Sequence, residues 1–228
     1  MIIAIDGPAA SGKSTTARLV ADQLGFTYLD TGAMYRAVTL AVIEQQLDYG
    51  NPAEIRNLLD NLELRLETRD SQTVIFLNGE DVSERIRSIA VTGMVSAISA
   101  IGAVREAMVA IQRKIGAHQN CVIEGRDIGT VVFPQAEFKF FIVADYEARA
   151  RRRQLDLEHM GEQRTLAELV SDLRLRDQKD SSRSHSPLKR AADAIEIDTS
   201  NLTINEQVTL IVDQVKRRPV KGTNDDRK

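Results

Sequence analysis

The chain has 228 residues, 43% of them hydrophobic, with a formal net charge of -3 and a single cysteine. This length suffices for one α/β domain or for a core with an insertion, and it allows a sizeable buried interior. The acidic balance argues against general attraction to nucleic acid or to an anionic membrane, and one cysteine excludes a disulfide framework.

The chain opens on an apolar run, Ile2 to Ile5, which is followed at once by a glycine-rich loop. This loop fits the spacing G-x-x-x-x-G-K-[ST] at every position; its residues are Gly7, Pro8, Ala9, Ala10, Ser11, Gly12, Lys13 and Ser14. A strand pattern precedes it and a helical pattern follows it as far as Gly25, which is the context that a phosphate-binding loop requires. We therefore predict that backbone N–H groups and Lys13 bind phosphates and that the Ser14 hydroxyl binds Mg²⁺.

Four more short apolar runs resemble the first: residues 26–29, 121–124, 138–143 and 194–197. They alternate with helical patterns, which predicts an α/β fold with a five-stranded parallel sheet wrapped by helices. Ligands of such sheets bind beyond the carboxyl ends of the strands, so we expect the chemistry in the residues that follow each run. Thr31 follows the second run closely, and Arg126 and Asp127 come just after the third.

A different pattern, typical of antiparallel strands, interrupts the alternation between about residues 60 and 85. Leu62, Leu64 and Leu66 alternate with charged residues, and Asn78-Gly79 is a strong hairpin signal. The pattern predicts a small antiparallel sheet, reached through a helix that begins near Ala33. We expect this segment to stand as a lobe over the strand ends, where it could close over a second substrate.

Arginines gather after the fourth apolar run, at positions 149, 151, 152 and 153. On a helix, Arg149 and Arg153 share a face, and their position beyond a core strand favours contact with polyphosphate. Arg151 and Arg152 are expected to point elsewhere, and Arg151 is interpreted as part of a solvated helix face.

A second charged segment, which contains Arg176, Asp180 and Arg183, lies before the last apolar run in a stretch rich in serine. The three histidines stand at helix ends or in this polar segment, and no metal-ligand spacing of His or Cys exists. Many cations without a nucleophile or a base are what transfer of a γ-phosphoryl group requires, since that reaction depends on positioning and charge neutralisation.

Three stretches of the chain together resemble the bacterial cytidylate kinase family. They are Asp6-Gly7-Pro8, the run L-D-T-G-A-M-Y-R from Leu29 to Arg36, and the run G-R-D-I-G-T-V-V-F-P from Gly125 to Pro134. The glycine-rich loop alone identifies only a superfamily. The other two runs are far more specific, and the resemblance covers nearly the whole chain.

The resemblance implies the nucleoside monophosphate kinase fold, which is a three-layer P-loop α/β fold. A kinase core would span residues 1–36 and 91–228, a monophosphate-binding insert residues 37–90, and a short lid residues 149–165. The implied reaction transfers a phosphoryl group from ATP, with Mg²⁺, to CMP or dCMP. No general base is needed, because the acceptor is already a phosphate anion.

The resemblance also implies roles for individual residues. ATP would be bound by the glycine-rich loop and Thr15, and from the lid by Arg149 and Arg153. Catalysis would fall to Lys13, Arg126, Arg153 and Arg183. The acceptor nucleotide would be bound by Thr31, Arg36, Ser96, Arg105, Arg126, Asp127, Arg176, Asp180 and Arg183. Within that set, Arg36, Arg126 and Arg183 match positions that bind the acceptor phosphate, and Arg176 and Asp180 match positions that bind the sugar.

Base selection is assigned by resemblance to Ser96, Arg105 and Asp127. Cytosine presents an amine donor and a ring-nitrogen acceptor where uracil presents the reverse, so a fixed carboxylate beside a cationic donor distinguishes them. Two alternatives stay open, since Ser96 could serve helix packing and Arg105 could be a surface arginine. The family often carries proline where this chain has Gly102, which leaves the start of the helix before Arg105 open.

Other classes share part of this pattern. A regulatory GTPase needs a D-x-x-G after a strand and an N-K-x-D, and neither is present in that context. The main alternative is another P-loop small-molecule or nucleoside monophosphate kinase with UMP, AMP or dTMP as acceptor, against which the run from Gly125 to Thr130 argues. A nucleic-acid-binding module would rest on the arginine clusters alone. We expect a cytoplasmic protein that does not span a membrane, because no leader pattern and no apolar stretch near ~20 residues is found. The acidic balance argues against a nucleic-acid partner, and we expect a monomer.

Overall fold

The computed structural model describes residues 1–69, 72–159 and 161–217. Its centre is the predicted parallel sheet of five strands, and their order is β2-β6-β1-β7-β8. The strands are β1 (Ile2–Asp6), β2 (Thr27–Asp30), β6 (Cys121–Gly125), β7 (Phe138–Val143) and β8 (Ile195–Asp198). All residues of β1 and β6 are buried, which explains why both read as nearly unbroken apolar runs.

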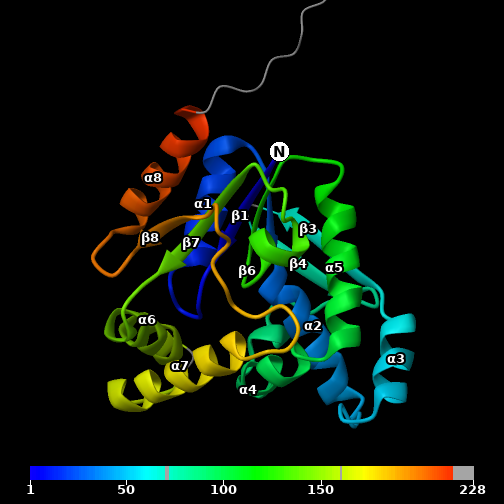
Figure 1. Cartoon of the computed structure of the whole chain (residues 1–228). Helices are drawn as coiled ribbons and strands as arrows, with labels where there is room; N and C mark the ends of the chain where they lie inside the picture. Colours follow the sequence, from blue (N-terminus) through cyan, green and yellow to red (C-terminus); the bar gives the residue numbers. More distant parts are fainter. Residues whose placement is uncertain (70–71, 160, 218–228) are drawn as a thin grey trace, which may run out of the picture.

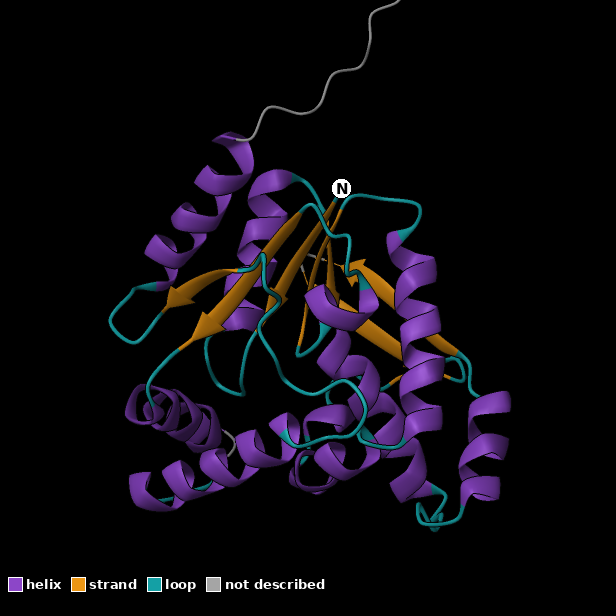
Figure 2. Cartoon of the chain, in the orientation of Figure 1, coloured by secondary structure: helices purple, strands orange, loops and turns teal. Residues whose placement is uncertain are grey.

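Helices cover both faces of this sheet (Figure 2). One face packs against α1 (Lys13–Leu24) and α8 (Ile204–Arg217), and the other packs against α2 (Thr31–Glu44) and α5 (Gly102–Gly116), as Figure 1 shows. Successive residues of β1 contribute to different cores: Ile3 and Ile5 lie in the core with α1 and α8, whereas Ile2 and Ala4 lie in the core with α2 and α5. The alternation follows from the two-residue period of a strand and confirms the three-layer arrangement.

The segment with the antiparallel pattern forms a separate sheet of three strands in the order β3-β4-β5. Its strands are β3 (Leu64–Arg69), β4 (Gln72–Leu77) and β5 (Glu80–Asp81), and α3 (Pro52–Asp60) precedes them. Asn78 and Gly79 both have positive φ, 50° and 86°, at the turn between β4 and β5. These are the dihedral signs of a tight hairpin turn, so the predicted hairpin is confirmed.

Three helices lie beyond the carboxyl ends of the parallel strands, at the end of the molecule away from the N-terminus (Figure 1). They are α4 (Ile89–Ile98), α6 (Tyr146–His159) and α7 (Leu166–Ser181); a short 3-10 helix (Arg85–Arg87) leads into α4. A capping box, Thr165 with Glu168, starts α7. These helices put many charged side chains opposite the glycine-rich loop.

The proposed division into core, insert and lid stays a prediction, and its residues 70–71, 160 and 218–228 lie outside the described residues. In the described part of the chain, no single helix has the length and apolar character needed to cross a membrane. Taken together, α4 and α5 satisfy that test of length and composition, but they meet at a bend of 99°.

Candidate active site

The glycine-rich loop curls tightly from the end of β1 to the start of α1. A side chain at Gly7 would place its Cβ 2.2 Å from the carbonyl oxygen of Ile142, so only glycine fits there. Gly12, with φ +90°, is the N-cap of α1 in the left-handed region. Lys13 is therefore the first helical residue, and the N–H groups of the first turn face the concave side of the loop.

A buried carboxylate, Glu124, lies beside the start of α1. The Nζ of Lys13 is 3.7 Å from Glu124 Oε2, and the Ser14 hydroxyl donates to the same oxygen at 2.8 Å. Burial, and then the charge of Arg126, lowers the pKa of Lys13; burial, and then the charge of Asp30, raises the pKa of Glu124. The two groups thus pair weakly with each other in a site where both charges are costly.

Sequence reasoning missed Glu124, although a signal existed. It is the one charged residue in the run from Cys121 to Gly125 and stands on the strand next to β1. A charge on a strand that is otherwise wholly apolar is rarely buried without a partner or a ligand.

Arg152 contacts the outer side of the glycine-rich loop. Its guanidinium donates to the carbonyl of Ser11 at 3.0 Å and to the carbonyl of Thr199 at 2.6 Å, and the Thr199 hydroxyl donates to the same Ser11 carbonyl at 2.9 Å. The prediction that Arg152 points elsewhere is therefore wrong. Residues three apart on a helix are neighbours as much as residues four apart, so Arg152 shares the side of α6 that carries Arg149. Arg151 faces solvent near Glu147, as predicted.

Arg149 is only 2% exposed and ties the loop to two helices. Its Nε donates to the carbonyl of Ala9 at 2.7 Å, and its two terminal nitrogens bind Asp177 on α7 at 2.6 and 2.9 Å. All three guanidinium nitrogens are thus engaged by the protein. Arg153 makes no ion pair within the described ranges. Burial is the main cause that lowers the pKa values of Arg36 and Arg176, and the charge of Arg153 adds to it.

A group of cations from several elements converges beyond the strand ends. We call it the phosphate end; it consists of Lys13, Arg36, Arg126, Arg153 and Arg176. Arg36 donates to the Thr92 hydroxyl at 2.9 Å, and Arg126 binds Asp180 at 3.1 Å. The Nε of Arg176 is buried without a hydrogen-bond partner in the described part of the chain. Burial and then the charge of Arg126 lower the pKa of Arg176 to about 10, so this end holds more positive charge than its own carboxylates balance.

A second group, which we call the base end, pairs its charges internally. It consists of Ser96, Arg105, Asp127, Asp180 and Arg183. Arg105 and Asp127 form an ion pair, and each is 4% exposed. Arg105 is therefore a buried residue rather than a surface arginine, and its guanidinium lies 5.3 Å from the centre of the Tyr35 ring.

Arg183 completes the base end. It donates to Asp180 at 2.5 Å, to the Ser99 hydroxyl at 3.1 Å and, at the long distance of 3.4 Å, to the Ser96 hydroxyl. Ser96 thus faces this ion pair and does not serve helix packing alone. The helix that carries Arg105 begins at Gly102, directly after its N-cap Ile101.

Asp6, the last residue of β1, joins the two halves of the site. Its two carboxylate oxygens accept the N–H groups of Ile128 and Gly129, both at 2.8 Å, in the π-helical turn that follows Asp127. Burial raises the pKa of Asp6 to about 7 in spite of these two donors. On the other side, the Thr31 hydroxyl donates to the carbonyl of Glu124 at 2.6 Å.

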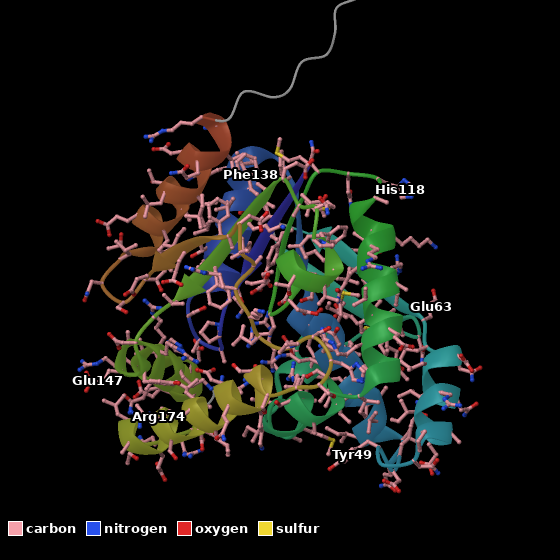
Figure 3. The ribbon with its side chains drawn as sticks, viewed as in Figure 1. Tyr49, Glu63, His118, Phe138, Glu147 and Arg174 are labelled. Carbon is pink, nitrogen blue, oxygen red and sulfur yellow. The ribbon has the colours of Figure 1, made fainter. Side chains whose placement is uncertain are left out.

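The remaining predicted residues lie around this arrangement. The side chains of Ser14 and Thr15 are exposed at the start of α1, and the Ser11 hydroxyl is buried without a partner in the described residues. His118 lies at the opposite end of the molecule, near the N-terminus (Figure 3). The described residues hold no cluster of three or more His, Cys, Asp or Glu side chains that could bind a metal ion.

Comparisons with known proteins show the family to which the chain is similar. A family model described as cytidylate kinase matches residues 3–217. A cytidylate kinase of Halalkalibacterium halodurans is 48% identical over 96% of this chain and 98% of its own length; one of Lactobacillus gasseri is 45% identical over 96% and 95%. Among solved structures, an uncharacterized protein from Eubacterium ventriosum matches with a TM-score of 0.52 at 13% identity, over 96% of this chain and 99% of that chain, which shows the fold alone.

Proposed function

The chain belongs to the cytidylate kinase family, and from this membership we propose that it transfers the γ-phosphoryl group of ATP to CMP or dCMP, giving ADP and CDP or dCDP. The observation that carries the proposal is the convergence of Lys13 on the glycine-rich loop with the unbalanced arginines of the phosphate end. Two nucleotides that meet there bring the negative charge that these cations lack. Arginine suits this role because its planar group binds phosphate oxygens bidentately and stays charged.

The donor side follows from the glycine-rich loop. Its N–H groups and Lys13 would hold the β- and γ-phosphates, and Arg153, which has no ion pair within the described ranges, would reach the transferred group from α6. Arg149 acts on the glycine-rich loop and not on the phosphates directly. Because it binds the carbonyl of Ala9, it fixes the shape of the loop that surrounds the phosphates.

The residues at the start of α1 fit a magnesium ion bound together with ATP. The Ser14 hydroxyl donates a hydrogen bond to Glu124, so the lone pairs of the Ser14 oxygen are free for a cation. Magnesium in such sites is held by one or two protein oxygens together with substrate phosphates and water, and Ser14 and Glu124 supply such oxygens. Bound there, Mg²⁺ would neutralise part of the charge on the phosphates.

The acceptor phosphate would lie against Arg36 and Arg126. Because it is itself the nucleophile, the protein has to align it with the γ-phosphorus and needs no base. Arg176 and Asp180 would bind the sugar hydroxyls. Arg183 is held by Asp180 and Ser99, so we place it between the acceptor phosphate and the base end.

Asp127 would read the base. Its carboxylate is held in place by Arg105, so it can accept the exocyclic amine of cytosine while Arg105 faces the ring nitrogen or carbonyl. Uracil would turn a carbonyl oxygen toward the carboxylate and leave both groups unpaired, which is the most effective way for a buried polar site to reject a substrate.

We further propose that residues 37–90 act as the monophosphate-binding insert and 149–165 as the lid, and that the protein works as a cytoplasmic monomer without nucleic acid or membrane. The helices α4, α6 and α7 lie beyond the strand ends at which the two nucleotides would meet (Figure 1), whereas the sheet of the insert packs against α2 and the edge strand β2 and does not stand over those ends.

The deciding experiment is an ADP-release assay with ATP and a panel of CMP, dCMP, UMP, AMP, GMP and dTMP. We expect CMP and dCMP to be phosphorylated with the highest kcat/KM. Equal turnover of UMP or AMP would contradict the base assignment and favour the alternative of another nucleoside monophosphate kinase.

A further inference from the structure

Tyr28 lies on β2, and its hydroxyl contacts the Glu124 carboxylate beside the glycine-rich loop. We propose that Tyr28 is a positioning residue for magnesium: it holds the Glu124 carboxylate in the orientation that prepares the Ser14 hydroxyl to bind the metal ion. The proposal rests on the proposed function, because it concerns the ATP-bound metal.

The geometry around Glu124 is the first support. The Tyr28 hydroxyl donates to Oε1 at 2.5 Å, while the Ser14 hydroxyl donates to Oε2 at 2.8 Å. The two donors come from β2 and α1, and they occupy different oxygens of one carboxylate on β6. A carboxylate held from both sides has one orientation rather than several.

The burial of Glu124 explains why the hydrogen bond from Tyr28 matters. The Glu124 side chain is only 3% exposed, and Lys13, its nearest cation, stands 3.7 Å away. Without the Tyr28 hydroxyl, Oε1 would lose its donor in a buried site, and the carboxylate would be held at Oε2 alone and could turn.

The consequence reaches the metal through Ser14. A serine hydroxyl that donates to a fixed carboxylate points its lone pairs in a fixed direction, which a magnesium ion with strict octahedral geometry requires. If the Glu124 carboxylate turns, the Ser14 hydroxyl is free to rotate, and its lone pairs no longer point in a fixed direction for the metal ion. Tyr28 itself stays protonated, because burial and then the charge of Glu124 hold its pKa far above the ordinary value.

A purely structural role is the competing explanation, since the Tyr28 ring packs against the core that contains α1. The variant Tyr28→Phe separates the two, because it keeps the ring and removes only the hydroxyl. Tyr49→Phe is the matched control: Tyr49 is 46% exposed and lies at the periphery of the molecule (Figure 3).

The readout is ATP affinity by isothermal titration calorimetry, with Mg²⁺ and with EDTA. We expect the gain in affinity that Mg²⁺ provides to fall about tenfold in Tyr28→Phe, the scale of second-layer effects at metal sites. ATP affinity in EDTA, CMP affinity and all values for Tyr49→Phe should stay unchanged. A structural defect would instead lower ATP affinity in EDTA and CMP affinity as well, and thermal melting verifies that each variant is folded.

A double-mutant cycle tests whether Tyr28 acts through Glu124. Glu124→Gln should reduce the Mg²⁺-dependent gain by itself, and adding Tyr28→Phe should reduce it no further. An unchanged gain in Tyr28→Phe, or additive losses in the double variant, would overturn the proposal. These binding results are separate from the acceptor panel, so a protein that failed to phosphorylate CMP would refute the proposed function without deciding the role of Tyr28.

Discussion

The phosphate end and the base end lie in one site but handle charge in opposite ways. At the base end each charged side chain has an internal partner, as in the Arg105 and Asp127 pair, and the pairs are buried. At the phosphate end the cations crowd one another, and Arg36, Arg153 and Arg176 make no ion pair with the described residues. Buried guanidinium nitrogens without a partner in the described residues occur at both ends, on Arg176 and on Arg105 and Arg183. The charges of the base end are thus balanced in the free protein, whereas those of the phosphate end are not.

This contrast fits the roles proposed for the two ends. A base is neutral and is distinguished by the direction of its donors and acceptors, so the groups that read it have to be fixed beforehand. A phosphate is recognised by its charge, so the site can keep cations in excess and accept a cost in stability. Mutations at the two ends should therefore differ in which property they change.

The largest effect is expected for Lys13→Ala, at the phosphate end. Its loss removes a charge that is needed for every acceptor, so kcat should fall about 10³-fold with CMP, dCMP and UMP alike. Steady-state assays with each acceptor measure this, with Arg151→Ala, on the solvated side of α6, as the control. A loss confined to one acceptor would show that Lys13 serves base selection instead.

Arg105→Met at the base end should chiefly affect stability. It leaves Asp127 charged and buried without its partner, so the free energy of unfolding should fall by about 3 kcal/mol in urea denaturation. The double variant Arg105→Met with Asp127→Leu should regain most of that loss. If the single variant lost less than about 1 kcal/mol, the pair would not be as dry as its burial indicates.

Asp127→Ala should lower selectivity, and it should also cost stability, because it leaves Arg105 charged and buried without its partner. It removes the carboxylate that rejects uracil, so the ratio of kcat/KM for CMP over UMP should fall about 10²-fold. The acceptor panel measures this ratio, and thermal melting checks that the variant is folded. An unchanged ratio would move base selection to other residues of the base end.

The smallest effect, and the one opposite in sign, is expected for Arg176→Met. Removing one buried cation from a crowded group should raise the free energy of unfolding by about 0.5 to 1 kcal/mol while it raises the KM for CMP. Urea denaturation and steady-state kinetics test the two halves of this trade-off. Lower stability of this variant would mean that Arg176 is balanced in the free protein and would remove the contrast between the ends.

The fold could be predicted from the sequence because its signals are local. The apolar runs, the Asn78-Gly79 turn and the G-x-x-x-x-G-K-[ST] spacing each depend on neighbouring residues, and the structure confirms the strands that they predict. Tyr28 and Arg152 could not be found in that way, whereas Glu124 left a signal as the one charge in an apolar run. Tyr28 and Arg152 each act on a partner far away in the chain, and in a pattern each resembles an ordinary strand or helix residue.

Arg149 also shows what a sequence pattern alone does not predict. Its position after the fourth strand was enough to connect it with phosphate binding, but its engagement by Asp177 and by the Ala9 carbonyl depends on how α6 packs against α7. The sequence pattern locates such a cation near the site, and tertiary packing decides whether it is available to a ligand.

Asp6 limits how far the glycine-rich loop and the turn after Asp127 can move relative to each other. The glycine-rich loop leaves β1 directly after Asp6, and the carboxylate of Asp6 binds the turn that follows Asp127. The proposed supports of the donor phosphates and of the acceptor nucleotide are thereby fastened to each other at a single point on the sheet. Closure of the surrounding helices can then cover the reactants and expel water, but the spacing between donor and acceptor is set by the rigid frame before any movement begins.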